Sequence, residues 1–184
     1  MKSKRAFLTI STASLFTSSG VLTGCSAPSM GVNEAVRKID AKLAGTFASV
    51  GPPLKKSDGP ARITEGANSF TNEPNGEGVV ARTGYVRTKV SKARVVVLAK
   101  AVEKHWKAKG YELENASRKV PTFEYSTPEG VSLTFDVNGD LITIGATVSD
   151  VEYPGHGDID DGDFPNGLGD VGPTPNVRDP YWSK

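Results

Sequence analysis

Two stretches of the chain repeat hydrophobic residues at the spacing of an α-helix. The first follows Asn33, a residue type typical of helix N-caps, and ends at the Gly-Pro-Pro of residues 51–53. The second follows Ser91 and ends at Gly110. We therefore expect two amphipathic helices, each burying one face. The apolar stripes comprise Val32, Val36, Ile39, Leu43 and Phe47 in the first helix, and Val95, Leu98, Ala99, Val102 and Trp106 in the second.

Elsewhere hydrophobic and polar residues alternate, which is typical of β-strands. Residues 131–137 alternate most regularly, and the Asn138-Gly139 pair after them is a strong signal for a hairpin turn. Residues 141–148 are apolar at most positions, which predicts a central strand. The other predicted strands cover residues 79–90, 111–118 and 122–127. This order of elements predicts an α+β fold, in which an antiparallel sheet of about four strands carries two helices on one face.

Two polar stretches show neither the helical nor the strand spacing of hydrophobic residues. Residues 54–77 are rich in Gly, Pro, Asn and Ser, and we expect a long loop there. Residues 154–184 consist largely of Gly, Pro, Asp and Asn, which predicts an acidic, disordered tail with Tyr181 and Trp182 exposed near its end. We expect this tail to be removable without unfolding a globular domain that spans residues 32–153.

The first 24 residues have the features of a bacterial signal peptide. Basic residues occur at positions 2, 4 and 5, and residues 6–22 are uncharged. Residues 3–8 also resemble the twin-arginine export motif, with Lys4 in place of its first arginine. Both the general secretory route and the twin-arginine route therefore stay open.

The sequence Leu22-Thr23-Gly24-Cys25 closes the signal peptide and resembles the lipobox of bacterial lipoproteins. Lipobox chemistry requires a thiol to accept a diacylglycerol group, and small preceding residues that give the peptidase access to the bond before the cysteine. Cys25 is the single cysteine of the chain, which excludes an intramolecular disulfide. We expect cleavage before Cys25, a lipidated tether over residues 25–31 that can carry palmitate, and an extracytoplasmic domain held on the cell membrane.

Residues 104–112 and the Thr-Pro-Glu-Gly turn at residues 127–130 are similar to those of small actinobacterial, Streptomyces-type lipoproteins of uncharacterised function. The similarity covers roughly residues 78–150 together with the lipobox. It implies the fold and the envelope location but no activity.

Two charged clusters are candidate binding sites. Alternating carboxylates followed by glycine could hold a hard cation such as Ca²⁺, although the spacing differs from an EF-hand loop and a solvated acidic tail is the simpler interpretation. Lysines on the polar side of the second helix could bind anionic lipid, an anionic envelope polymer or the tail, or could be a plain solvated face. The carboxylates are Asp158, Asp160, Asp161 and Asp163, and the lysines are Lys100, Lys104 and Lys107.

No catalytic motif is recognisable, and no cofactor is expected. Of the two histidines, His105 flanks the apolar stripe beside Trp106, and His156 falls in the expected tail. We favour a non-catalytic envelope module that binds an envelope protein or an anionic polymer, with nucleic acid excluded by the extracytoplasmic location. The alternative is an envelope hydrolase with a carboxylate-based site. That alternative requires one cleft to gather at least two of Glu103, Glu112, Glu124 and Asp136.

Overall fold

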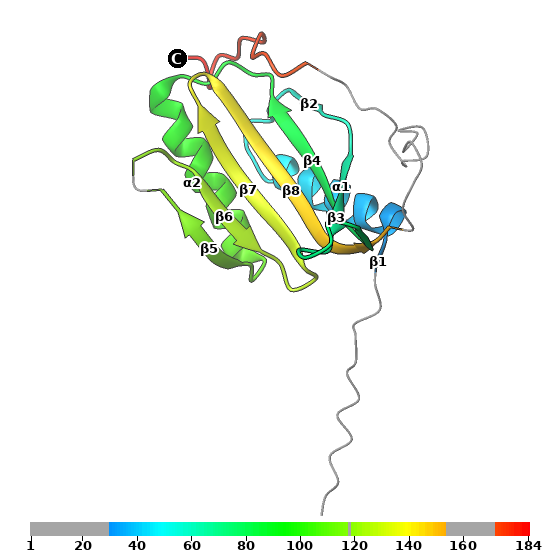
Figure 1. The fold of residues 1–184 in the computed structure, drawn as a ribbon. Coiled ribbons are helices and arrows are strands. Elements are labelled where there is room, and N and C mark those ends of the chain that lie inside the picture. Colours follow the sequence, from blue (N-terminus) through cyan, green and yellow to red (C-terminus); the bar gives the residue numbers. More distant parts are fainter. Residues whose placement is uncertain (1–29, 118, 154–171) are drawn as a thin grey trace, which may run out of the picture.

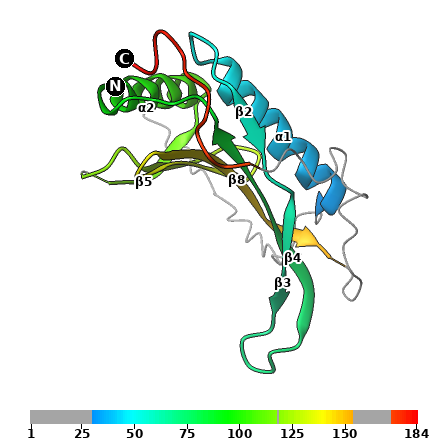
Figure 2. The ribbon, with the colours of Figure 1, turned by 90° about the horizontal axis from the view of Figure 1, so that it is seen from above.

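The structure, a computed structural model, describes residues 30–117, 119–153 and 172–184. It has the predicted α+β architecture, with two helices packed on one face of a mostly antiparallel sheet (Figures 1 and 2). The described residues form eight strands rather than about four. The additional strands are short or lie where the sequence is polar, so they carry no alternating signal.

Both helices bury the stripes that their hydrophobic spacing predicts. Helix α1 spans Val32–Ala48 and helix α2 spans Lys92–Ala108. Ser91 is the N-cap of α2, as expected, but the N-cap of α1 is Gly31 and not Asn33. Gly31 is held extended because it pairs with the last strand of the sheet, so the helix starts directly after it.

The strands are ordered β2-β4-β8-β7-β6-β5, with β1 added to β8 and β3 added to β4. β8 is central, as its apolar sequence predicts, and the hairpin turn between β7 and β8 has Gly139 in the left-handed region at φ 61°. The strands are β1 (Met30–Gly31), β2 (Lys56–Asp58), β3 (Arg62–Ala67), β4 (Pro74–Val86), β5 (Glu112–Ala116), β6 (Phe123–Ser126), β7 (Val131–Asn138) and β8 (Leu141–Glu152).

The prediction of a long loop over residues 54–77 is wrong, because this stretch contains β2, β3 and the beginning of β4. β3 pairs with β4 in an antiparallel hairpin whose outer part extends beyond the rest of the sheet (Figure 2). Four of the six residues of β3 are exposed and the other two are half-buried. A strand with water on both faces needs no apolar side, which is why its sequence resembles a loop.

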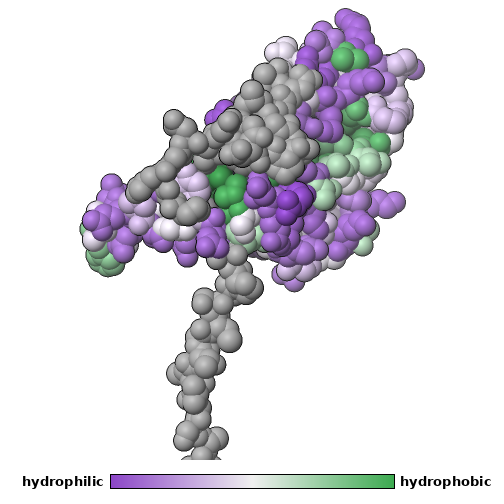
Figure 3. All heavy atoms as spheres, turned by 90° about the vertical axis from the view of Figure 1, so that its right-hand side faces the viewer, coloured by the Kyte–Doolittle hydropathy of each residue, from purple (hydrophilic) through white to green (hydrophobic). Residues whose placement is uncertain are grey.

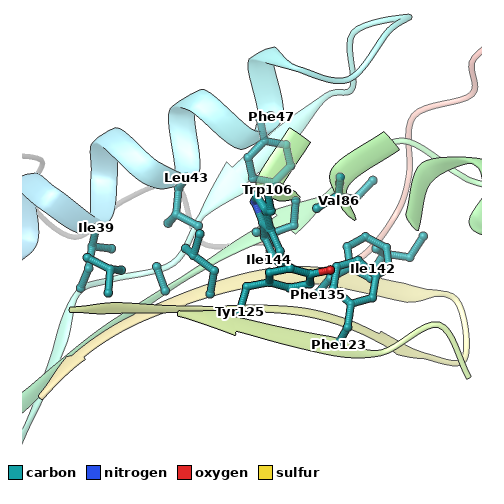
Figure 4. Packing of buried hydrophobic residues seen from close by; sticks show 14 of the residues in the cluster. Ile39, Leu43, Phe47, Val86, Trp106, Phe123, Tyr125, Phe135, Ile142 and Ile144 are labelled. Atoms are coloured by element: carbon teal, nitrogen blue, oxygen red, sulfur yellow. The ribbon is translucent and has the colours of Figure 1, made fainter. Parts of the chain in front are cut away.

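The core lies between the sheet and the two helices (Figure 4). Trp106 is fully buried at the junction of α1, α2 and β6. Its ring contacts Phe123 and Tyr125 edge-on, with centroids 5.4 and 5.5 Å away. Its indole Nε1 donates a hydrogen bond to Thr46 Oγ1 at 2.9 Å, which satisfies the polar atom that burial would otherwise leave unpaired.

The prediction that residues 172–184 belong to a disordered tail is wrong. Val177 pairs with Thr88 in a parallel bridge, and the Ser91 amide donates to the Trp182 carbonyl at 2.9 Å. Trp182 is fully buried, and its Nε1 donates to the Pro52 carbonyl at 2.9 Å. One buried indole, scattered side-chain contacts and a few backbone bonds leave no periodic signal in the sequence. Residues 154–171 lie outside the described residues.

Replacing the anchor of this C-terminal segment should destabilise the whole domain. Trp182→Ala removes a fully buried ring and is expected to lower the free energy of unfolding by about 3–5 kcal/mol. Lys184→Ala, at an exposed position two residues later, should change it by less than about 0.5 kcal/mol. Urea unfolding of residues 26–184 measures both. Equal midpoints for the two variants would show that the segment does not belong to the folded unit.

Candidate functional site

A groove of about 780 Å³ opens between the C-terminal ends of α1 and α2 and the turn that joins β6 to β7. Helix α1 forms one wall, and the last turn of α2 with Tyr111 forms the other. Its lining residues are Ala41, Lys42, Gly45, Ala48, Ser49, His105, Lys109, Tyr111, Pro128 and Glu129.

Lys42 connects the two sides of this inter-helix groove. Its Nζ lies 3.0 Å from Glu129 Oε2 and donates to the Tyr111 hydroxyl oxygen at 3.2 Å. The same atom lies 5.1 Å from the centre of the Tyr111 ring, within the range of a cation–π contact. Burial disfavours the charge on Lys42, but the hydrogen bonds to Glu129 and Tyr111 outweigh it and raise the Lys42 pKa above 10.5. The hydrogen bond from Lys42 is also the main cause that holds the pKa of Glu129 below 4.5.

Two glycine turns place the partners of Lys42. Gly110 has φ 73° and ends α2, so that the chain reverses into β5 with Tyr111 at the rim of the groove. Gly130 has φ 77°, and its amide donates to the Thr127 carbonyl at 3.0 Å, which closes the turn that carries Glu129. A side chain at either glycine would strain the backbone.

His105 and Lys109 lie on the α2 side of the groove. His105 is half-buried, as its position beside the apolar stripe predicts. Burial and, secondarily, the charge of Lys109 lower the His105 pKa below 6.5, so the imidazole is neutral at pH 7. The charged residues of the lining are then Lys42 and Lys109 against Glu129, which gives the groove a small positive excess.

The three candidate lysines of α2 are exposed, as expected for its polar side. Lys107 Nζ pairs with Glu103 Oε1 at 2.7 Å, one helical turn earlier. Glu103 also accepts a hydrogen bond from the Tyr125 hydroxyl at 3.1 Å. Lys100 and Lys104 therefore carry the unpaired charge of this surface, and none of the three lysines lines the inter-helix groove.

Of the four carboxylates that a hydrolase would need, two share the open face of the sheet and two lie elsewhere. Glu124 accepts a hydrogen bond from Ser132 at 2.7 Å, and Asp136 accepts one from Thr122 at 2.9 Å. These two side chains alternate with buried neighbours on β6 and β7, so they lie on the sheet face that no helix covers. Glu103 is on α2 and Glu112 is exposed on the edge strand β5. None of the four lines the inter-helix groove.

Sequence patterns do not single out the groove residues other than His105 as candidate site residues. Lys42 and Glu129 are separated by 87 positions, so neither spacing nor motif relates them. The Thr-Pro-Glu-Gly turn is visible in the sequence, but it reveals a backbone reversal and not the partner of its glutamate.

The remaining predicted sites lie outside the described residues. These are Leu22, Thr23, Gly24 and Cys25 of the lipobox, His156, and the carboxylates Asp158, Asp160, Asp161 and Asp163. Within the described ranges, no group of three or more His, Cys, Asp or Glu residues could hold a metal ion. No helix within them is long and apolar enough to span a bilayer.

No protein-family model and no curated protein matches the chain. Among solved structures it is similar to a DUF4853 family protein from Actinomyces odontolyticus. The two share 14% sequence identity with a TM-score of 0.44, over 74% of this chain and 77% of the other.

Removing the lysine should release the carboxyl group of Glu129. In Lys42→Met the Glu129 pKa is expected to rise toward 4.5, because its main stabilising hydrogen bond is lost. Carbon-detected NMR titration of the carboxyl group measures this. Lys104→Met, on an exposed part of α2, should leave the Glu129 pKa unchanged. Since the folded-state pKa of Glu129 is depressed, the ion pair stabilises the fold above about pH 4.3, and this contribution disappears as the pH falls through the folded value. An unaltered Glu129 pKa in Lys42→Met would contradict the contact.

Proposed function

We propose that this protein is a membrane-anchored, extracytoplasmic lipoprotein whose folded domain is a non-catalytic binding module of the cell envelope. The lipobox-like sequence Leu22-Thr23-Gly24-Cys25 carries the proposal, because it places the single thiol of the chain directly after an uncharged segment with a basic start. Lipid on Cys25 would hold the domain on the membrane without a spanning helix.

The inter-helix groove is the proposed binding site. Concave sites with a few convergent polar groups are the usual location of ligand binding. The Tyr111 hydroxyl accepts from Lys42, so its own proton remains available, and no acceptor for it is found among the described residues. With Lys109 and the neutral His105, the groove offers mainly hydrogen-bond donors. These groups suit a ligand with acceptor oxygens and an anionic group, supplied by an envelope polymer or by an acidic segment of an envelope protein.

The arrangement of the groove also supports a binding role over a hydrolytic one. Lys42, Glu129 and Tyr111 satisfy one another through direct contacts. Within the described part of the chain, His105 is not hydrogen-bonded to a hydroxyl that it could activate as a nucleophile. A carboxylate-based hydrolase would need Glu124 and Asp136, which share the open face of adjacent strands, to line a cleft, and none of the four candidate acids lines the inter-helix groove.

Substituting the cysteine tests the anchor. Cys25→Ala should abolish lipidation and leave a larger, uncleaved precursor, because the acyl group is added to that thiol before the peptidase acts. Metabolic labelling with a fatty acid, followed by gel electrophoresis, measures both effects. Undiminished label on the alanine variant would contradict the lipoprotein proposal.

Two related sugars test the ligand class. N-acetylmuramic acid carries a carboxylate that N-acetylglucosamine lacks, on an otherwise similar ring. In an NMR titration of residues 26–184, the acid should shift the signals of Lys109, His105 and Tyr111 saturably, and the neutral sugar should bind several-fold more weakly. Lys109→Met should remove most of this preference, and the matched variant Lys104→Met should keep it. Equal responses to both sugars would contradict an anion-binding groove.

A further inference from the structure

The β3–β4 hairpin projects from the sheet as a separate feature. Glu77 of β4 pairs with Glu152, the last residue of β8, and the Tyr153 amide donates to the Gly76 carbonyl. Beyond this point the hairpin pairs with no other strand among the described residues, and β3 and β4 pair with each other as far as Ala67 and Pro74. The hairpin stands out at the bottom of Figure 2 and at the left of Figure 3, where a small hydrophobic patch lies at its end among hydrophilic residues.

Phe70, in the turn of this hairpin, is 96% exposed. The turn holds itself in shape through internal hydrogen bonds. The Asn68 amide donates to the Glu73 carbonyl and the Asn72 amide to the Asn68 carbonyl, both at 2.8 Å, and the Phe70 amide donates to Asn68 Oδ1 at 2.9 Å. The ring is therefore presented outward by an ordered turn whose backbone is already partly satisfied.

The end of the hairpin is nearly free of charge. Between residues 66 and 76, Glu73 is the single ionisable residue. An exposed aromatic ring gains free energy when its apolar surface leaves water, and uncharged surroundings let it enter the interfacial region of a bilayer. Because the charge on Glu73 is negative, we expect the hairpin to have no preference for anionic lipid.

The chain enters the domain beside the base of the same hairpin. Met30 of β1 pairs with Val151 of β8, which pairs on its other side with Gly78 of β4. Two strand spacings, about 10 Å, therefore separate Met30 from Gly78. Cys25 stands five positions before Met30, and five residues reach at most about 17 Å. The hairpin extends beyond Gly76 by a similar length, about 10–15 Å. A lipid on Cys25 and the ring of Phe70 can thus reach one surface together.

We propose that the β3–β4 hairpin is a second membrane contact, in which Phe70 enters the interface of the bilayer that carries the Cys25 lipid. The inference rests on the proposed lipid anchor, and it adds how the folded domain is oriented on the membrane. One aromatic ring is too weak to bind a membrane alone, but the tether raises its effective concentration at the surface. α1 starts at the hairpin end of the molecule and its Phe47 lies over Gly84, near the other end of β4. The C-terminal end of α1, which forms one wall of the inter-helix groove, therefore lies away from the hairpin.

The test uses lipidated protein reconstituted into vesicles of phosphatidylcholine brominated in the acyl chains. The thiol of Cys25 carries the lipid, so Ser69→Cys supplies one reactive thiol, next to Phe70, for a fluorophore. Lys104→Cys, exposed on α2, is the matched control position. We expect brominated lipid to quench the label at position 69 several-fold more than the label at position 104. Adding Phe70→Asp should reduce the quenching at position 69 to the control value, without changing the melting temperature of this exposed site.

Co-sedimentation with the vesicles separates the two claims. If the protein sediments but the label at position 69 is quenched no more than the control, or if Phe70→Asp has no effect, the hairpin contact is wrong and the lipid anchor stands. If the protein does not sediment, the anchor is wrong and the inference falls with it. If the fluorescence of the label at position 69 changes with protein concentration and not with brominated lipid, the hairpin contacts a second copy of the chain and the inference is wrong.

Discussion

The buried indole of Trp106 is the contact on which the arrangement of the domain depends. Its ring fills the space between α2 and the aromatic side chains of β6, and its Nε1 reaches Thr46 of α1 at 2.9 Å. α1 packs mainly against β4 and β8, so this hydrogen bond joins two helices that otherwise contact different parts of the sheet. The inter-helix groove lies beside this junction, and the separation of its two helical walls follows from how Trp106 seats α2 against α1.

A buried ion pair and the C-terminal segment complete this helical layer. Arg82 faces inward from β4 with 2% of its side chain exposed, and its Nη1 lies 2.6 Å from Asp40 of α1. Such a pair fixes the position of a helix on a sheet more than it adds stability, because desolvation offsets much of the attraction. Trp182 donates a hydrogen bond to the Pro52 carbonyl, shortly after the end of α1, and so ties the C-terminal segment to this helical layer. The groove and the projecting hairpin are consequently parts of one folded unit.

Sequence periodicity was sufficient for the elements that bury one face. The stripe ending at Trp106 and the alternation of β7 specify burial directly, and Asn138-Gly139 specifies the turn after it. Periodicity could not reveal β3, which has water on both faces, or the C-terminal segment, which is held by scattered side-chain contacts and by backbone bonds. The same limit applies to the groove. Lys42 and Glu129 are ordinary surface residues in the sequence, and only the packing of α1 against the β6–β7 turn makes them partners.

The central claim, that one buried hydrogen bond couples the two helices, is tested most directly by a double-mutant cycle on Trp106 and Thr46. Trp106→Phe keeps an aromatic ring but removes the donor, and Thr46→Val removes the acceptor at nearly constant volume. The free energies of unfolding of the two single variants and the double variant, from urea titrations, give the coupling energy. We predict a coupling of about 0.5–1.5 kcal/mol, the usual net value of a buried neutral hydrogen bond. Additive effects of the two substitutions would contradict the account.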